Sequence, residues 1–236
     1  MKRVFFYYCL LFVQPVWSFR SLYIPKNPKQ EKLDGFLKQN VPIVVAEGPA
    51  GTGKTLLSTQ HAIQLFSEEK IKKIVMTRPT VFTGSDIGFL PGTLEDKMQP
   101  WMMPMMDVFY EFYTKDKLKR LMNEGSIEIV PMGFMRGRSF RHCAIIADEM
   151  QNSTPEQMKM LLTRIGEESK IVITGDLKQT DLPVSSNNGL KDFLDRLSFG
   201  YVQPHEMIRD GIAVVRLDGQ CIERHPVIFK ILDLYS

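Results

Sequence analysis

The chain has 236 residues, 44% of them hydrophobic and 24% charged, which is enough apolar material for one globular domain and excludes a disordered chain. Its formal net charge of +3 is small for this length and gives no support to a broadly basic nucleic-acid-binding surface, although it is compatible with a local patch. The three cysteines show neither a disulfide framework nor the CxxC spacing of metal ligands, so the body of the chain is predicted to suit a reducing compartment.

Residues 1–18 have the layout of a secretory signal peptide. Lys2 and Arg3 precede an apolar run, Val4 to Val13, and a short segment then ends at the small residue Ser18. The run is too short for a transmembrane helix, which needs about 20 residues. A first core strand or a wrongly assigned start codon is the alternative. Phe19, directly after the predicted cleavage point, resembles the presequences of algae with secondary plastids, so the expected location is such a plastid or, alternatively, the cytoplasm.

Short apolar runs alternate with helical stretches after an N-terminal lead-in, whose residues 24–32 (IPKNPKQEK) are predicted to be exposed. The runs are rich in β-branched residues and nearly continuous, as in strands buried on both faces of a parallel sheet. The predicted strands are 43–47, 73–77, 127–131, 143–148, 170–176 and 212–217, and the predicted helices are 54–69, 98–122, 155–165 and 188–197. This alternation predicts a three-layer αβα domain with a mainly parallel sheet.

Two of these helices have clear start signals. Ser153 or Thr154 is predicted to cap a helix whose first position is Pro155, and Asn187 or Asn188 to cap the next one.

The stretch 97–113 contains five methionines, one tryptophan and several other aromatic residues. Met-rich surfaces can bind partners, but such a stripe is more often core, so a packed insertion is predicted in preference to a binding groove. Pro100 and Pro104 are expected to break the stretch into short pieces.

Residues 48–55, GPAGTGKT, fit the phosphate-binding pattern GxxxxGK[ST] and lie between a predicted strand and a predicted helix. The glycines let consecutive N–H groups point at phosphate oxygens, and the helix N-terminus adds a favourable dipole. Lys54 is predicted to neutralise the β- and γ-phosphates, and Thr55 to bind Mg²⁺. The predicted nucleotide-binding residues are Gly48, Pro49, Ala50, Gly51, Thr52, Gly53, Lys54 and Thr55.

Adjacent carboxylates, Asp148 and Glu149, end the apolar run AIIADE (144–149). Ligands of open α/β sheets bind at the carboxyl ends of strands, so Asp148 is predicted to hold Mg²⁺ and Glu149 to orient and deprotonate the attacking water. Two solvated acids at a strand end are the alternative interpretation.

The segment ITGDLKQTDLP (173–183) places further polar groups at the end of the next apolar run. Thr174, Asp176 and Gln179 are expected within reach of the neighbouring strand end, where a glutamine can bond the γ-phosphate or the attacking water. A turn rich in polar capping residues is the alternative.

These motifs together resemble the PhoH family of ATPases. The resemblance rests on GPAGTGKT, on the stretch from TRPTVFTG to GFLPG and beyond (77–107), on MGFMRGRSFRHCAIIADEMQN (132–152) with GDLKQTDLP (175–183), and on GIAVVRL followed by RHPVI. It covers about residues 25–235 and implies a RecA-like P-loop core, related to one half of superfamily 1 helicases, that binds ATP. It also implies a role in RNA metabolism and a ring-shaped homo-oligomer. The expected organisation is a signal peptide (1–18), a lead-in (19–41) and an ATPase domain (42–236).

Single residues gain expected roles from the same resemblance. Gln30 corresponds to a glutamine that contacts adenine, although a solvated linker residue is the alternative, and Gln179 corresponds to a phosphate-sensing glutamine. Arg164, Arg216 and Arg224 match basic positions of the family, and which of them reaches a γ-phosphate is left open.

A local basic cluster, Arg136, Arg138 and Arg141, precedes the strand of the acidic motif. Guanidinium groups grip phosphates and stack on bases, so the cluster is a candidate contact for nucleic acid or another subunit, with an ordinary solvated loop as the alternative. Arg78 lies, by analogy with related motors, where single-stranded nucleic acid would pass.

The function expected from the sequence is Mg²⁺-dependent ATP hydrolysis coupled to RNA metabolism, with Lys54, Glu149 and Gln179 as the catalytic residues. Single-stranded RNA is the expected partner, and no stable transmembrane segment is expected. Because one RecA-like domain lacks the second half that a strand-separating motor uses, such activity would need an oligomer. A non-hydrolytic ATP-dependent binding module and a small-molecule kinase are the alternatives.

Overall fold

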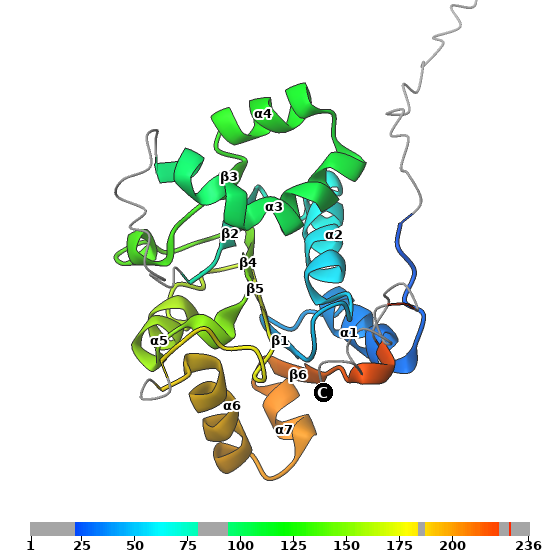
Figure 1. The fold of residues 1–236 in the computed structure, drawn as a ribbon, viewed down its shortest axis with the longest axis vertical. Coiled ribbons are helices and arrows are strands. Elements are labelled where there is room, and N and C mark those ends of the chain that lie inside the picture. The colour runs from blue at the N-terminus through cyan, green and yellow to red at the C-terminus, as the bar shows by residue number, and fades with distance from the viewer. Residues whose placement is uncertain (1–21, 80–93, 184–186, 222–226, 228–236) are drawn as a thin grey trace, which may run out of the picture.

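The computed structural model describes residues 22–79, 94–183, 187–221 and 227 (Figure 1). The predicted signal peptide, the GFLPG segment and Arg224 lie outside these residues, so the predictions on them stay predictions. Among the described residues, no helix combines the length and the apolar character that crossing a membrane requires.

A six-stranded sheet forms the centre of the domain, in the order β3-β2-β4-β5-β1-β6. Every pairing between its strands is parallel. The strands are β1 (Ile43–Glu47), β2 (Lys73–Thr77), β3 (Ile127–Ile129), β4 (Cys143–Ala147), β5 (Lys170–Gly175) and β6 (Ile212–Arg216). All six predicted strands are thereby confirmed, and four of them are one or two residues shorter than expected.

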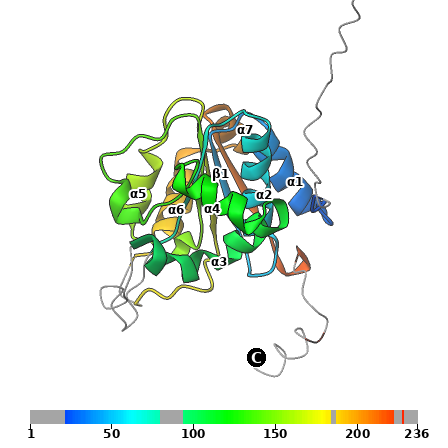
Figure 2. The same ribbon diagram turned by 90° about the horizontal axis from the view of Figure 1, so that it is seen from above.

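Helices cover both faces of this sheet. They are α1 (Pro28–Lys38), α2 (Lys54–Ser67), α3 (Leu94–Phe112), α4 (Lys115–Asn123), α5 (Pro155–Leu162), α6 (Gly189–Gly200) and α7 (Pro204–Arg209). Figure 2 shows α1 and α2 on one side of the strands and α5 and α6 on the other. The predicted three-layer αβα fold with a parallel sheet is confirmed.

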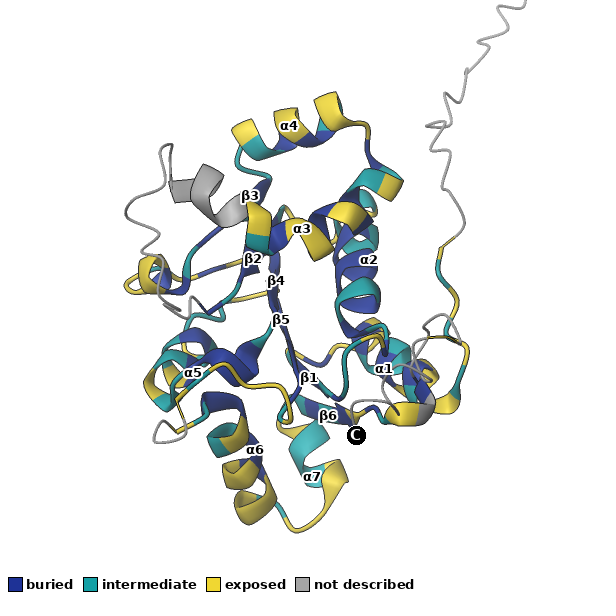
Figure 3. Cartoon of the chain, viewed as in Figure 1, coloured by how far each residue is buried: buried dark blue, intermediate teal, exposed yellow. Residues whose placement is uncertain are grey.

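The central strands β4 and β5 are buried along their whole length, as Figure 3 shows by colour. Successive side chains of a strand point to opposite faces of the sheet, so both faces are buried. In β1, Val44 and Ala46 join a core cluster with Leu33 of α1, while Val45 joins the opposite cluster with Leu161 of α5. This arrangement explains why the strands are continuously apolar in sequence, because no side of them faces water.

The N-terminal lead-in is the first correction. Residues 24–32 were predicted as an exposed lead-in without a helix, whereas residues 28–38 form the helix α1. Asn27 caps this helix by accepting hydrogen bonds from the backbone N–H groups of Lys29 and Gln30, at 3.1 and 2.9 Å, and Pro28 occupies the first turn. Both start signals are visible in the sequence, and the helix was missing from the prediction because this cap was overlooked.

The Met-rich stretch is the second correction, because α3 continues through Pro100 and Pro104. Both prolines are exposed, so the carbonyl groups that lose their N–H donors lie on the side where water can bond them. On the other side Met102, Met105 and Phe109 are completely buried against α2 and the sheet. Burial of each such side chain stabilises the folded protein by about 1.5–3 kcal/mol. Together these contributions offset the cost of about 3 kcal/mol for each proline inside the helix. The predicted packed insertion is confirmed.

The two predicted helix caps are resolved as Thr154 and Asn188. Thr154 forms a capping box with Gln157 at the start of α5. Asn188 accepts a hydrogen bond from the backbone N–H of Lys191 at the start of α6. Both helices therefore begin where the sequence places their start signals.

Candidate nucleotide-binding site

The candidate site lies at the carboxyl ends of β1, β4 and β5, which are neighbours at the centre of the sheet. The loop 48–53 follows β1, Asp148 and Glu149 follow β4, and Asp176 follows β5. Because parallel strands end at the same edge, this topology brings the three predicted motifs together.

The loop 48–53 depends on glycine at two positions. A Cβ atom on Gly48 would lie 2.5 Å from the carbonyl oxygen of Leu217, so only glycine fits between β1 and the chain that leaves β6. Gly53, which precedes α2, has a φ of 83°, a conformation that favours glycine. The loop thereby presents its backbone at the N-terminus of a 14-residue helix, an arrangement that favours phosphate.

Lys54 lies across this loop. Its Nζ donates hydrogen bonds to the carbonyl oxygens of Gly48 and Pro49, at 2.6 and 2.8 Å. Burial lowers the pKa of Lys54, while the carboxylates of Glu149 and Asp176 act in the opposite sense. The ammonium group is thus held at the mouth of the loop, next to the acidic strand ends.

Asp148 is the acceptor for two hydroxyl groups. The Oγ1 atoms of Thr55 and Thr174 both donate to its Oδ1, the former at 2.9 Å, and Asp148 is only 3% exposed. A hydroxyl and a carboxylate that already share a hydrogen bond are hard oxygen ligands of the kind that Mg²⁺ takes, together with phosphate oxygens and water. Thr55 and Asp148 therefore fit the predicted metal site.

Glu149 follows in the left-handed conformation, with a φ of 54°, and is partly exposed. This backbone conformation is uncommon for a residue other than glycine. It directs the next residues into a 3-10 turn, Met150–Asn152, that packs against β5 and α6. The carboxylate of Glu149 accepts a hydrogen bond from the side-chain amide of Gln151 in that turn.

The segment after β5 is bonded to the same turn. The backbone oxygen of Gln179 accepts from Nε2 of Gln151 at 3.0 Å, and the side chain of Gln179 is exposed. Asp176 is buried, and its Oδ1 accepts from the backbone N–H of Lys178 at 3.0 Å. The structure therefore places Gln179 beside the acidic motif, and its phosphate-sensing role stays a prediction.

Gln30 lies at the end of the phosphate loop. It is completely buried, so the interpretation as a solvated linker residue is wrong. Its Nε2 donates to the carbonyl oxygen of Thr52 at 3.2 Å, and its Oε1 accepts from the backbone N–H of Lys26 and from the hydroxyl of Tyr23. A glutamine amide can pair with the N6 and N7 atoms of adenine, and its position next to Thr52 is compatible with the predicted adenine contact.

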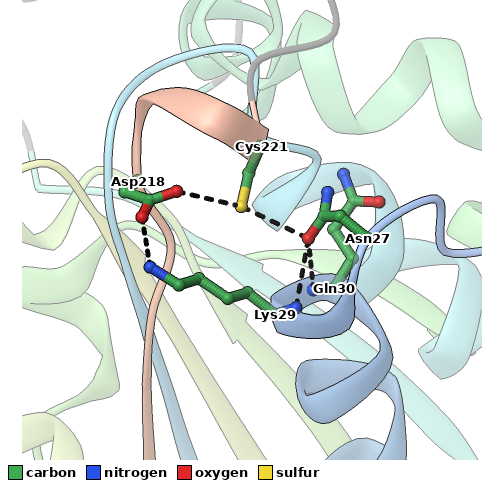
Figure 4. Close-up of polar contacts among 5 residues, drawn as sticks. All are labelled: Asn27, Lys29, Gln30, Asp218 and Cys221. Carbon is green, nitrogen blue, oxygen red and sulfur yellow. Dashed lines mark hydrogen bonds and ion pairs between the residues drawn. The ribbon is translucent and has the colours of Figure 1, made fainter.

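Residues that follow β6 close the same end of the site (Figure 4). The thiol of Cys221 donates to Oδ1 of Asn27 at 3.3 Å, and Lys29 forms an ion pair with Asp218. Asn27 also caps α1, so the carboxyl-terminal side of the domain fixes the helix that carries Gln30.

The predicted arginine cluster does not act as one group. Arg138 makes a bidentate ion pair with Glu128 of β3, at 2.7 and 2.9 Å, and its guanidinium lies 4.7 Å from the centre of the Phe140 ring. Arg136 and Arg141 are exposed. Arg138 therefore has a structural role here, and the predicted partner contact rests on its two neighbours.

Arg78 follows β2 and donates from Nη1 to the backbone oxygen of Trp101 at 3.0 Å, which ties α3 to the sheet. Its predicted role next to nucleic acid stays a prediction.

Two of the three arginines considered for the γ-phosphate, Arg164 and Arg216, lie in the part of the chain that the structure describes, at different places. Arg164 bonds the backbone around Arg138 and Phe140, which precede β4, so it lies about one strand length, roughly 16 Å, from the edge that carries Asp148. Arg216 ends β6 beside Glu47, where it opposes the effect of burial, which raises the pKa of Glu47. Of these two, only Arg216 lies at the candidate site of its own chain.

Sequence reasoning missed Gln151, which is 1% exposed and contacts both the acidic motif and the segment after β5. Its position two residues after Glu149 was the available signal.

A family model described as "PhoH: PhoH-like protein" matches residues 23–236. The chain is 40% identical over 233 residues to a PhoH-like protein of Bacillus subtilis (strain 168), covering 92% of this chain and 69% of that protein. It is 39% identical over 212 residues to a PhoH-like protein of Mycobacterium tuberculosis (strain ATCC 25618 / H37Rv), covering 90% and 57%. It is 34% identical over 196 residues to Protein PhoH of Escherichia coli (strain K12), covering 82% and 53%.

Among solved structures, the Pif1 helicase from Candida albicans is similar, with a TM-score of 0.43 and 16% identity over 90% of this chain and 43% of that one. The chain spans 53 to 69% of the length of the three PhoH relatives from Bacillus subtilis, Mycobacterium tuberculosis and Escherichia coli.

Proposed function

The chain belongs to the PhoH family, and we propose that it hydrolyses ATP in a Mg²⁺-dependent reaction that is coupled to RNA. The observation that carries the proposal is the convergence of Lys54, Asp148 and Glu149 at one edge of the sheet. A loop that binds phosphate, a pair of metal-ligand oxygens and a carboxylate base are the three parts that P-loop hydrolases combine.

Binding of the triphosphate would use the backbone N–H groups of residues 48–55 and the ammonium of Lys54. Lys54 would exchange its two bonds to loop carbonyl groups for bonds to phosphate oxygens, with a gain in charge neutralisation. Thr55 and Asp148 would hold Mg²⁺, which, when bound, neutralises charge on the β- and γ-phosphates. The buried amide of Gln30 would recognise the base.

Glu149 would act as the general base. It is the carboxylate next to the proposed metal ligand Asp148, and, unlike Asp148, it is partly exposed, so it can meet a water molecule. It would orient this water for in-line attack and accept its proton. Arg216, at the same edge, would stabilise negative charge on the phosphates. Alternatively, a second subunit would supply the positive charge.

Coupling to RNA rests on the exposed arginines Arg136 and Arg141 and on the family relationship. These side chains offer phosphate contacts on a chain whose net charge is otherwise small. We therefore expect binding of single-stranded RNA to depend steeply on salt concentration.

The test is ATP hydrolysis by the full chain with Mg²⁺, with and without single-stranded RNA, for wild type, Glu149→Gln and Glu167→Gln. Glu167 is exposed, and its backbone bonds His142, which precedes β4, so Glu167→Gln makes the same chemical change at the opposite edge of the sheet. Loss of a general base is expected to lower kcat by about 100-fold or more, with Mg·ATP affinity within about twofold of wild type.

Equal kcat in wild type and Glu149→Gln would contradict the assignment of the base. Hydrolysis that does not respond to RNA would contradict the coupling while leaving the ATPase proposal intact.

A further inference from the structure

Gln151 lies in the 3-10 turn after β4 and makes three hydrogen bonds, one to Glu149 and two to the segment after β5. Its Nε2 donates to Oε2 of Glu149 and to the backbone oxygen of Gln179, the latter at 3.0 Å. Its Oε1 accepts from the backbone N–H of Asp176 at 3.1 Å. The amide thus uses both of its N–H groups and its oxygen, so rotating it by half a turn would break all three bonds.

The side chain of Gln151 is also tightly packed. The side chain is 1% exposed. A Cβ atom on Gly175 would lie 2.9 Å from its Oε1 and 2.5 Å from Cδ2 of Leu190, so a larger residue there would have to displace one of these side chains. Gln151 therefore cannot move independently of the segment after β5.

The side chain of the neighbouring residue Asn152 anchors the same segment, and only the backbone N–H of Asn152 bonds Glu149, at its backbone oxygen, 3.0 Å away. Nδ2 of Asn152 donates to Oδ2 of Asp181 at 3.0 Å, and Oδ1 of Asn152 accepts from the backbone N–H of Asp181 at 2.8 Å. The segment 176–181 is thus tied to the turn without Gln151. What Gln151 adds is a bond to the carboxylate of Glu149.

We propose that Gln151 is a positioning residue that couples the orientation of the Glu149 carboxylate to the segment 176–181. The bond from Gln151 occupies Oε2 of Glu149 and so directs Oε1 to the attacking water. Movement of the segment displaces the amide, because Asp176 and Gln179 hold it on two sides, and the amide displaces the carboxylate. This inference rests on the proposed ATPase function, in which Glu149 is the base.

Gln151→Glu and Asn152→Asp form a matched pair for the test. Each replaces an amide donor by a carboxylate that faces an existing carboxylate, Glu149 in the first case and Asp181 in the second. Both weaken the attachment of the same segment, but only Gln151→Glu alters the contact with the base. We expect kcat to fall at least tenfold in Gln151→Glu and less than threefold in Asn152→Asp, with the Kd for Mg·ATP within twofold in both.

A second readout does not depend on turnover. Hydrogen exchange of residues 176–181 is measured with and without Mg·ATP, and the response to nucleotide is expected to be at least halved in Gln151→Glu and retained in Asn152→Asp. Gln151→Met, which keeps the shape and adds no charge, serves if Gln151→Glu unfolds, and the same differences from Asn152→Asp are expected.

Equal losses of kcat in the two variants would show that Gln151 only anchors the segment and would overturn the inference. An unchanged exchange response in the Gln151 variant would overturn it as well. If wild type does not hydrolyse ATP, the proposed function fails, and the exchange response alone then decides whether Gln151 links the two segments.

Discussion

Acidification from pH 7 to pH 5 is expected to cost this protein about 2 kcal/mol of stability through one buried imidazole, that of His61 on α2. His61 is 6% exposed, and neither ring nitrogen has a hydrogen-bond partner among the residues that the structure describes. Burial lowers its pKa from 6.5 to about 4; the charges of Lys170 and Lys38 act in the same direction, and those of Asp34 and Glu68 oppose it. The imidazole is therefore neutral in the folded protein at pH 7.

The sign of the effect follows from the order of the two pKa values of His61. Between pH 6.5 and about 4 the unfolded chain binds a proton that the folded protein does not. Stability is therefore undiminished above the unfolded pKa and falls as the pH is lowered through this window. The full difference of 2.5 pKa units corresponds to about 3.4 kcal/mol, and the greater part is lost by pH 5.

Urea unfolding at pH 7, 6 and 5, followed by circular dichroism, tests this for wild type, His61→Leu and Thr59→Val. Thr59 lies on the same helix, and its buried side-chain oxygen also lacks a hydrogen-bond partner within the described part of the chain, but a threonine hydroxyl does not titrate. The free energy of unfolding of His61→Leu relative to wild type should rise by about 2 kcal/mol from pH 7 to pH 5, and Thr59→Val should follow wild type. Parallel pH profiles for wild type and His61→Leu would refute the reasoning.

Three further predictions concern single residues. Asn27→Ala should lower the free energy of unfolding by about 1 kcal/mol through loss of the α1 cap, and an unchanged urea midpoint would contradict the role of the cap. Lys170→Met should lower it by about 2 kcal/mol, because Nζ of Lys170 bonds three carbonyl groups at the end of α1; a loss below 0.5 kcal/mol, about the effect of an ordinary surface substitution, would contradict this. Gly48→Ala should weaken Mg·ATP binding at least tenfold in calorimetry, since its methyl group meets Leu217, and wild-type affinity would show that the loop adapts.

The strands were predictable because their sequence signal is redundant. Each central strand is buried on both faces, so nearly every position is apolar and the apolar run itself marks the strand. The ends were less certain: Val130 and Pro131 continue the apolar run beyond β3, although Val130 still donates its N–H to Met76 of β2. Such positions are apolar without being part of the strand, and the sequence does not distinguish them from apolar positions within the strand.

The helices show where local rules compete. Pro100 and Pro104 argue against a helix locally, but the burial of Met102, Met105 and Phe109 against α2 outweighs them, and this packing is not visible in the sequence. The helix α1 was overlooked for a different reason. Its cap, Asn27, is visible in the sequence, but the polar composition of the lead-in was given more weight.

The candidate site could be predicted as far as its motifs extend. Lys54, Thr55, Asp148 and Glu149 converge because parallel strands end at one edge. The contacts of Gln151 could not be predicted, because they depend on the conformation of Glu149 and on the missing side chain of Gly175. The ion pair of Arg138 could not be predicted either, since its partner Glu128 lies on β3, while Arg138 lies in the loop before β4.

The order of the strands also determines when the phosphate loop can form. β1, which leads into that loop, pairs only with β5 and β6, so Ile43 meets Ile171 and Ile212 across long stretches of chain. Contacts of such sequence separation form late in folding. During synthesis, which proceeds from the N-terminus, residues 43–53 therefore leave the ribosome long before their partners do. A nucleotide bound as proposed would therefore stabilise the domain only after β5 and β6 have been added beside β1.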